Sequence, residues 1–237
     1  MRTSGGDARK LLGALEIVVE SVDSDEIVIT DDMVNARIQQ NLARYDKTGE
    51  QHYDIISAFI KSIRGSDPNA AVYWLARMIE GGEDLKFIAR RLVIAASEDI
   101  GNANPTALIM ANNTFQAVSV VGYPVSRIIL AQCVTYLASS PKSNAAYMAI
   151  NDAQNDVRRL GDLPVPLHLR NAPTALMKEL NYGTEYIYPH DIEGSFARQE
   201  YMPDELKGTR YYSPKENDRE EALRRYLKSR WGDKYDY

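Results

Sequence analysis

The stretch that decides the fold includes residues 105–139, which read PTALIMANNTFQAVSVVGYPVSRIILAQCVTYLAS. Between Asp99 and Lys142 the only charged residue is Arg127. Helices that are apolar nearly all round are normally buried on every side. We therefore expect this stretch to form the central helices of a domain, a subunit interface, or both, because obligate interfaces resemble a core cut in half.

Helical periodicity continues on both sides of this stretch. Pro105 and Pro124 divide the stretch itself, since proline cannot sit inside a regular helix. Residues 27–29 form a β-branched run, which is either a strand fragment or a buried connector. The pattern predicts helices at about 7–19, 31–42, 52–64, 68–80, 83–100, 105–121, 124–139, 142–160 and 216–231.

The amino-acid composition changes after Gly161, where six prolines divide the chain into short segments. Nine of the 15 tyrosines lie between Tyr182 and Tyr237. Proline removes hydrogen-bond donors and tyrosine supplies large area with a polar tip. We expect this segment to pack as an irregular arm over a helical scaffold.

Composition narrows the class of protein. The 237 residues carry 28 Lys+Arg against 33 Asp+Glu, a formal net charge of -5, and 44% are hydrophobic. This is a globular mixture, which excludes disorder over most of the chain and a basic wrapping of nucleic acid by the whole chain. The single cysteine, Cys133, excludes an intrachain disulfide and reads as a small core residue. No apolar leader and no apolar run of 18 residues is present, so the sequence predicts a soluble cytosolic protein.

Catalytic motifs are absent from this sequence. No G-x-x-x-x-G-K-[ST] loop occurs, and no acid pair follows an apolar strand as in a Walker B motif. His52, His168 and His190 are candidates for acid–base chemistry in a small hydrolase, but no nucleophile or third metal ligand accompanies them. A structural hydrogen-bonding role is the alternative. The acid pair Glu98-Asp99 ends a helix at a place that the helix dipole disfavours, and a cation such as Arg90 or Arg91 would offset this. The pair is either a site for a cation or a partner, or a buried salt bridge that holds the helix end.

Cations interleaved with aromatic residues give a second functional hypothesis, a single-stranded DNA-binding module carried by the arm. Residues 198–237 hold ten Lys+Arg and nine Asp+Glu, so a solvated face of mixed charge is the alternative. The candidate phosphate contacts are Lys142, Arg158, Arg159, Arg170, Lys178 and Arg210.

Six strings in order carry a family resemblance. They are GDARK (6–10), SDPNAAVYWLARM (66–78), SEDIG (97–101), PKSNA (141–145), VPLHLRNAP (165–173) and YMP (201–203). Together they resemble the C-terminal half of the replication-associated recombination protein A (MgsA, RarA) family of AAA+ ATPases, whose eukaryotic member is the Werner helicase-interacting ATPase. The resemblance covers essentially the whole chain.

The resemblance implies an all-α fold in three parts: an AAA+ lid remnant at 1–44, a helical linker or associated domain at 45–100, and a clamp-loader-like oligomerisation domain with an irregular C-terminal arm at 101–237. Arg9 lies in what looks like the sensor-2 motif, which meets the nucleotide γ-phosphate. Because the nucleotide-binding domain is absent from these residues, we expect a truncated form that starts inside the lid, binds no cofactor and is not an enzyme. The full-length family protein uses ATP and Mg²⁺.

The family context also implies a function. Members assemble as tetramers, act at stalled replication forks, and bind single-stranded DNA and duplex ends. The leading prediction is therefore a tetramerisation and partner- or DNA-binding module of a DNA-dependent ATPase. Expected partners are further copies of the chain, DNA and replication proteins such as single-strand binding protein, at the nucleoid in the cytoplasm and not at a membrane.

Overall fold

Helices form the regular structure of this chain. The computed structural model describes residues 19, 29, 30 and 50–237, and within those residues no strand occurs. This confirms the all-α expectation. The helices expected at 7–19 and 31–42 and the run at 27–29 fall outside the described residues except for single positions, and Arg9 falls outside them entirely.

The chain divides into two compact units, which are discontinuous in sequence. The described part of unit 1 comprises residues 50–95 and 109–139, and unit 2 comprises 96–108 and 140–237. The three-part division expected from sequence stays a prediction.

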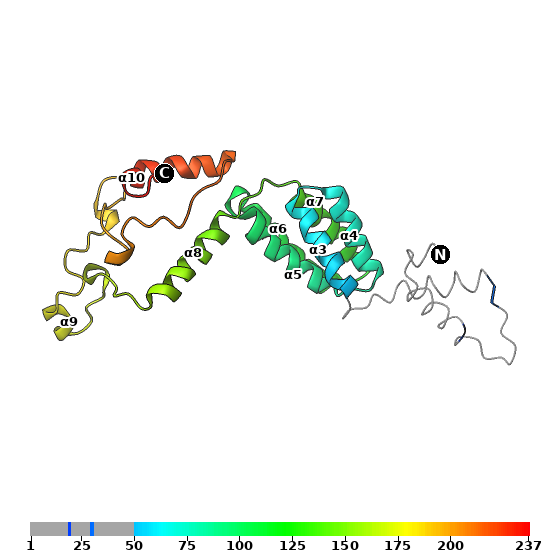
Figure 1. Ribbon diagram of the computed structural model, residues 1–237, viewed down its shortest axis with the longest axis horizontal. Coiled ribbons are helices and arrows are strands. Elements are labelled where there is room, and N and C mark those ends of the chain that lie inside the picture. Colours follow the sequence, from blue (N-terminus) through cyan, green and yellow to red (C-terminus); the bar gives the residue numbers. More distant parts are fainter. Residues whose placement is uncertain (1–18, 20–28, 31–49) are drawn as a thin grey trace. The chain divides into compact units, whose positions relative to one another are not determined.

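Unit 1 is a helical bundle built around one nearly uncharged helix (Figure 1). Its helices are α3 (Glu50–Arg64), α4 (Pro68–Glu80), α5 (Leu85–Ala95), most of α6 (Thr106–Val121) and α7 (Ser126–Ala138). Helix α7 packs against α3, α4 and α5, and its Leu130, Val134 and Leu137 are fully buried. For α7, the central-helix alternative is therefore confirmed.

Local sequence explains where the helices of unit 1 begin. The Asp67 side chain caps α4 by accepting hydrogen bonds from the backbone N–H groups of Asn69 and Ala70, at 3.0 and 2.9 Å. Pro68 follows at the first helical position, where its missing N–H is no loss. Predicted and observed bounds agree here because capping is a local interaction.

Unit 2 joins a short junction to one long helix, an arm and a terminal helix. The junction consists of a π-helical turn η1 (Ala96–Ile100) and a 3-10 turn η2 (Gly101–Ala103), which pack on α8 (Ala145–Leu160). The helix expected at 83–100 thus ends as an α-helix at Ala95, widens into the π-helical turn and then tightens into the 3-10 turn. The remaining elements are η3 (Leu167–Leu169), α9 (Ala175–Glu179), η4 (Pro189–Asp191), η5 (Asp204–Leu206) and α10 (Asp218–Tyr235).

The arm, residues 161–217, is irregular as expected. Pro166 and Pro203 immediately precede the turns η3 and η5, and Pro189 opens η4. Proline fixes φ near the helical value but offers no N–H to a longer ladder, so each turn starts and soon stops. None of the helices in the described ranges combines the length and apolarity that a bilayer span requires.

Candidate interaction surfaces

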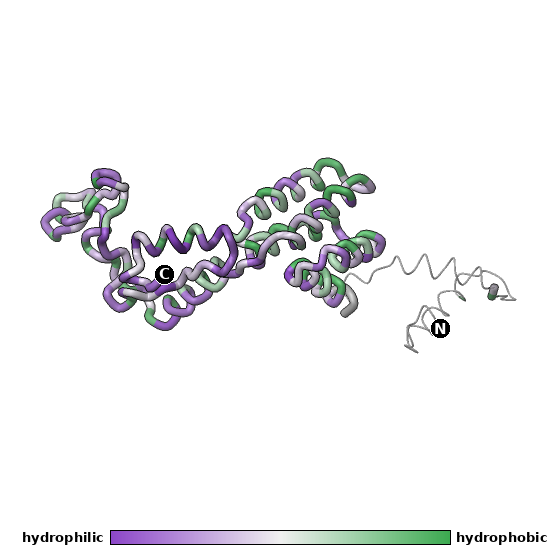
Figure 2. Tube along the Cα trace, turned by 90° about the horizontal axis from the view of Figure 1, so that it is seen from above, coloured by the Kyte–Doolittle hydropathy of each residue, from purple (hydrophilic) through white to green (hydrophobic). Residues whose placement is uncertain are grey.

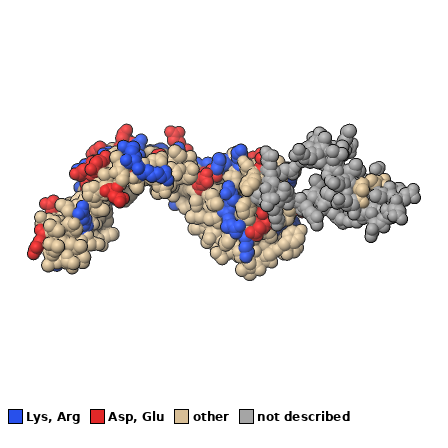
Figure 3. Space-filling view, turned by 60° about the horizontal axis from the view of Figure 1, so that its bottom comes forward, with Lys and Arg blue, Asp and Glu red and all other residues tan. Residues whose placement is uncertain are grey.

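The turn between α6 and α7 exposes a set of apolar side chains, which we name the α6–α7 corner. Val120 is 87% exposed, Tyr123 67%, Ile128 58% and Val125 52%. Val121 is the fifth member, and the only charge within the corner is that of Arg127. In Figure 3 a broad part of the unit 1 surface carries neither basic nor acidic residues, whereas both signs are interspersed over the visible part of unit 2.

The corner is exposed because α6 buries only one stripe. Ala111, Thr114 and Val118 recur at helical spacing and are buried, while the opposite face of the helix is open. Figure 2 shows the greater hydropathy of the unit 1 helices compared with the segment that ends at the C-terminus. An uncharged sequence thus serves two purposes here: α7 fills the core and α6 presents apolar surface.

The two strings SEDIG and PKSNA, far apart in sequence, meet in the junction of unit 2. The backbone N–H of Ser143 donates to the carbonyl of Asp99 at 2.8 Å, and Asn104 Nδ2 donates to Ser140 Oγ at 3.0 Å. Burial lowers the pKa of Lys142, an effect that the nearby Asp99 charge opposes. Arg90 forms an ion pair with Asp84 at 3.6 Å, and Lys142, which sequence reasoning did not propose for this role, is a cation that lies near Asp99.

The six predicted DNA contacts are spread over unit 2, and most have partners within the protein. Lys142 Nζ donates to the carbonyl of Ser140 at 2.5 Å. Arg170 donates to the carbonyl of Val165 at 2.6 Å, and its guanidinium lies 5.0 Å from the Tyr182 ring centroid.

The other four are exposed. Arg158 donates to Asn155 at 3.1 Å, and Arg159 pairs with Asp156 at 2.5 Å. Arg210 donates to carbonyls at the end of α10, that of Tyr235 at 3.0 Å. The side chain of Lys178, on α9, makes no hydrogen bond or ion pair with the described residues. The structure thus gathers no single basic patch from these residues, and their DNA role stays a prediction.

A cluster of aromatic rings joins the arm to α10, and sequence reasoning did not single it out. Trp231 contacts Phe196 at 4.9 Å and Tyr235 at 5.9 Å between ring centroids. Lys234 Nζ lies 4.8 Å from the Tyr235 ring and 2.7 Å from Glu200 Oε1. Trp231 and Tyr235 stand four residues apart, the spacing of one helix face, which is the signal that could have found the cluster.

Glu220 holds the end of the arm against the start of α10. Its side chain is fully buried and accepts hydrogen bonds from Tyr212 Oη at 3.3 Å, the Lys215 backbone N–H at 3.2 Å and Asn217 Nδ2 at 2.7 Å. Asn217 in turn caps α10 by accepting from the Glu220 N–H at 3.0 Å. Asn217 and Glu220 are thus joined twice: Asn217 Oδ1 accepts from the Glu220 backbone N–H, and Asn217 Nδ2 donates to the Glu220 carboxylate.

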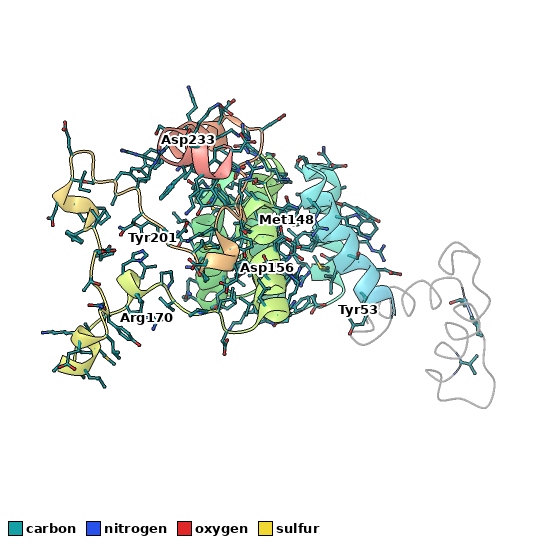
Figure 4. The ribbon with its side chains drawn as sticks, turned by 60° about the vertical axis from the view of Figure 1, so that its left-hand side comes forward. Tyr53, Met148, Asp156, Arg170, Tyr201 and Asp233 are labelled. Atoms are coloured by element: carbon teal, nitrogen blue, oxygen red, sulfur yellow. The ribbon has the colours of Figure 1, made fainter. Side chains whose placement is uncertain are left out.

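A groove opens between α8 and the arm, with a volume of about 360 Å³. Asp156 lies at its wall, where Oδ2 accepts from Tyr211 Oη at 2.9 Å. Hydrogen bonds from Arg159 and Tyr211 lower the pKa of Asp156, while burial and the Asp156 hydrogen bond raise that of Tyr211. Figure 4 labels Asp156 on α8 and Tyr201 on the arm.

The histidines and the cysteine occupy structural positions where they are described. His168 Nε2 donates to the carbonyl of Glu200 at 2.7 Å, and the exposed His190 ring lies 5.2 Å from that of Tyr188. Neither ring has a hydrogen bond or ion pair to a titratable side chain of the described residues. The side chain of His52 lies outside what the structure describes. Cys133 is buried, as expected, and burial raises its thiol pKa to about 11. Among the described residues no three His, Cys, Asp or Glu side chains are grouped to hold a metal ion.

Two family models match this chain. Residues 65–231 match the family model described as MgsA AAA+ ATPase C terminal, and residues 1–64 match one described as AAA C-terminal domain.

Curated relatives agree with these matches. Proteins named replication-associated recombination protein A are 47% identical over 212 residues in Coxiella burnetii and 45% identical over 213 residues in Escherichia coli K12, each alignment covering 88% of this chain and 48% of the relative. The Bacillus subtilis relative of the same name is 46% identical over 224 residues, covering 92% of this chain and 52% of its own. The chain spans about half the length of the curated relatives it matches. The resemblance seen in the six strings is confirmed, and the chain belongs to the MgsA AAA+ ATPase C-terminal family.

Proposed function

We propose that this chain is the assembly module of a DNA-dependent AAA+ ATPase that acts in replication-fork maintenance and recombination, and that it forms a homotetramer. Its relatives are named for replication-associated recombination, which supports a role in replication and recombination. In the whole protein, ATP and Mg²⁺ would bind a nucleotide-binding domain, with Arg9 directed to the γ-phosphate. In this proposal the chain itself carries out no catalysis.

The observation that carries the proposal is the exposure of the α6–α7 corner. Burying a Val, Ile or Tyr side chain contributes about 1.5–3 kcal/mol. Association costs about 4–15 kcal/mol in lost translational and rotational freedom. Five such side chains on each subunit are therefore comparable with that cost. Because the corner holds a single charge, Arg127, a second copy of the same surface meets little electrostatic repulsion.

Assembly would change how the whole protein meets its substrate. When several ATPase domains are held together, the second DNA contact becomes intramolecular and its effective concentration rises. Weak individual contacts to single strands or duplex ends then add up to stable binding. Replication proteins such as single-strand binding protein would be recruited to the same assembly.

Light scattering of the full chain at micromolar concentration tests the proposal. We expect a multiple of the 26.7 kDa chain mass, and a shift toward the monomer in the double variant Val120→Asp, Val125→Asp. Both side chains are more than half exposed, so each monomer should fold normally. Val165→Asp is the matched control, since Val165 is 55% exposed on the arm. A strict monomer in the unmodified chain would sink the proposal.

Single-stranded DNA binding by the arm and α10 is a second candidate function. It is supported by the cations that lie against aromatic rings, such as Arg230 at 5.5 Å from Tyr226, which is 59% exposed. Bases stack on such rings while cations contact phosphates.

Fluorescence anisotropy with a labelled thymidine oligonucleotide tests it. We expect affinity that falls steeply with salt and weakens in Lys178→Gln, whose ammonium is exposed. Binding that is absent, or insensitive to salt, would count against it.

A further inference from the structure

The groove beside α8, which we name the α8 groove, is built from one face of that helix. Ala153, Val157 and Leu160 recur at helical spacing along it, and the arm supplies Met202, Pro203 and Leu206 as the opposite wall. Its volume of about 360 Å³ is within the range of small-ligand sites. Val157 is 62% exposed, so an apolar wall faces solvent.

One of the two carboxylates in the groove lining, that of Asp156, is already paired. The two oxygens of the Asp156 carboxylate accept from Arg159 at 2.5 Å and from Tyr211 at 2.9 Å. The bond from Tyr211 ties α8 to the arm segment after η5, so the position of one wall relative to the other is fixed there without a ligand. A binding site that needs no reorganisation loses little free energy to ordering.

One end of the groove carries a free carboxylate. Asp162 lines it, is exposed, and makes no hydrogen bond or ion pair with any described residue. It follows Gly161, the C-cap of α8, so the negative end of the helix dipole lies beside the free carboxylate. Arg158, in the last turn of α8, donates to the neutral side chain of Asn155 and keeps its charge, whereas Arg159 is paired with Asp156. A cation at this end would therefore gain from both the carboxylate and the helix terminus.

From this arrangement we propose that the α8 groove binds a short peptide segment of a partner protein, in which apolar side chains stand next to lysine or arginine. The apolar side chains would fill the space between Val157 and Leu206, and the basic side chain would pair with Asp162. The acidic end disfavours the phosphates of DNA. The proposal does not depend on self-association and would stand if the α6–α7 corner proved inert.

Anisotropy titrations with the full chain test this proposal. The probe is a labelled octapeptide with two adjacent leucines between two lysines, and the comparison peptide has glutamates in place of the lysines. We expect saturable binding of the basic peptide, at least about tenfold tighter than that of the acidic one. Equal binding of the two, or no saturable binding of the basic peptide, would overturn the proposal.

Three variants locate the site. Val157→Asp should weaken binding of the basic peptide at least about tenfold, since it places a charge on the apolar wall. Asp162→Asn should weaken it about threefold to tenfold and reduce its salt dependence. Val165→Asp, a similarly exposed valine outside the groove, should bind as the unmodified chain does. Equal effects of Val157→Asp and Val165→Asp would overturn the assignment, as would a loss of self-association caused by Val157→Asp, because the groove would then belong to a subunit contact.

Discussion

Gly101 is a position where a single added methyl group should strongly destabilise unit 2. Its φ is +49°, a conformation that L-residues rarely adopt, and a Cβ added there would lie 2.9 Å from the carbonyl oxygen of Ser143. Ser143 cannot retreat freely, because its N–H donates to the Asp99 carbonyl at 2.8 Å. Gly101→Ala therefore combines backbone strain with a backbone clash.

The magnitude follows from these two terms. A left-handed φ costs an L-residue about 1–2 kcal/mol. Relieving the clash requires the Ser143–Asp99 hydrogen bond to lengthen, which costs about 1 kcal/mol more. We expect Gly101→Ala to lower the free energy of unfolding of unit 2 by about 2–3 kcal/mol. With a denaturant slope of about 2 kcal/mol per molar urea, the midpoint should fall by about 1–1.5 M.

Urea titration followed by tryptophan fluorescence is the assay. The chain has 2 tryptophans, so a Trp74→Phe background leaves Trp231 as the reporter within unit 2. Gly208→Ala is the matched control: its φ is +79°, but the nearest atom to an added Cβ is 3.9 Å away. The control should lose only the stability that corresponds to backbone strain, about 1–2 kcal/mol. Equal losses in the two variants would refute the clash argument, and no loss in Gly101→Ala would refute both terms.

Three further predictions concern the arm, its pH dependence and the thiol. Glu220→Ala should destabilise unit 2 by about 2–4 kcal/mol in thermal denaturation, because the donors of Tyr212, Lys215 and Asn217 lose a buried acceptor. Glu220→Gln should destabilise it less. An alanine variant as stable as the parent would contradict the role of Glu220 as their shared acceptor. Although burial acts to raise the pKa of Glu200, hydrogen bonds from Lys234 and the Met202 backbone outweigh it and hold that pKa below its ordinary value of 4.5. A carboxylate with a depressed pKa stabilises the fold above about pH 4.5, and this contribution is lost as the pH falls. Between about pH 5 and pH 3 the free energy of unfolding of the parent should therefore fall by about 0.5–1 kcal/mol more than that of Glu200→Gln. Parallel dependence of the two free energies on pH would exclude a stabilising Glu200–Lys234 pair. Cys133, with a thiol pKa of about 11, should react with a thiol reagent only after denaturation, and rapid labelling of the native protein would show that it is not buried.

Helices whose ends depend on neighbouring residues were predictable. The bounds of α4 follow from Asp67, Pro68 and Gly81, all within one turn of the helix end. The C-terminal end of α5 was not predictable from neighbouring residues. The chain changes to a π-helical turn at Ala96, and this turn is hydrogen-bonded through Asp99 to Ser143, a residue more than 40 positions away. Helix α9 was missed for another reason, since five residues are too few for a periodic pattern.

The candidate surfaces divide in the same way. The uncharged stretch was visible in the sequence. The sequence did not show that α7 buries its Leu130 face while Val120 and Tyr123 remain exposed. The cations chosen as DNA contacts were read from residue type alone, and hydrogen bonds to Ser140 and Val165 show that two of them serve the fold. The α8 groove had no sequence signal, because its two walls, residues 153–163 and 202–211, are far apart along the chain.

The amino-acid sequence by itself determined the all-α class, the family and the positions of most helices, since helix formation depends on patterns within a few residues. Only the tertiary structure decided which apolar residues are core and which are surface, which charges are already paired, and where Asp162 stands free beside an apolar wall. The physical reason is that burial and pairing depend on neighbours brought together by folding, and these neighbours are far apart along the chain.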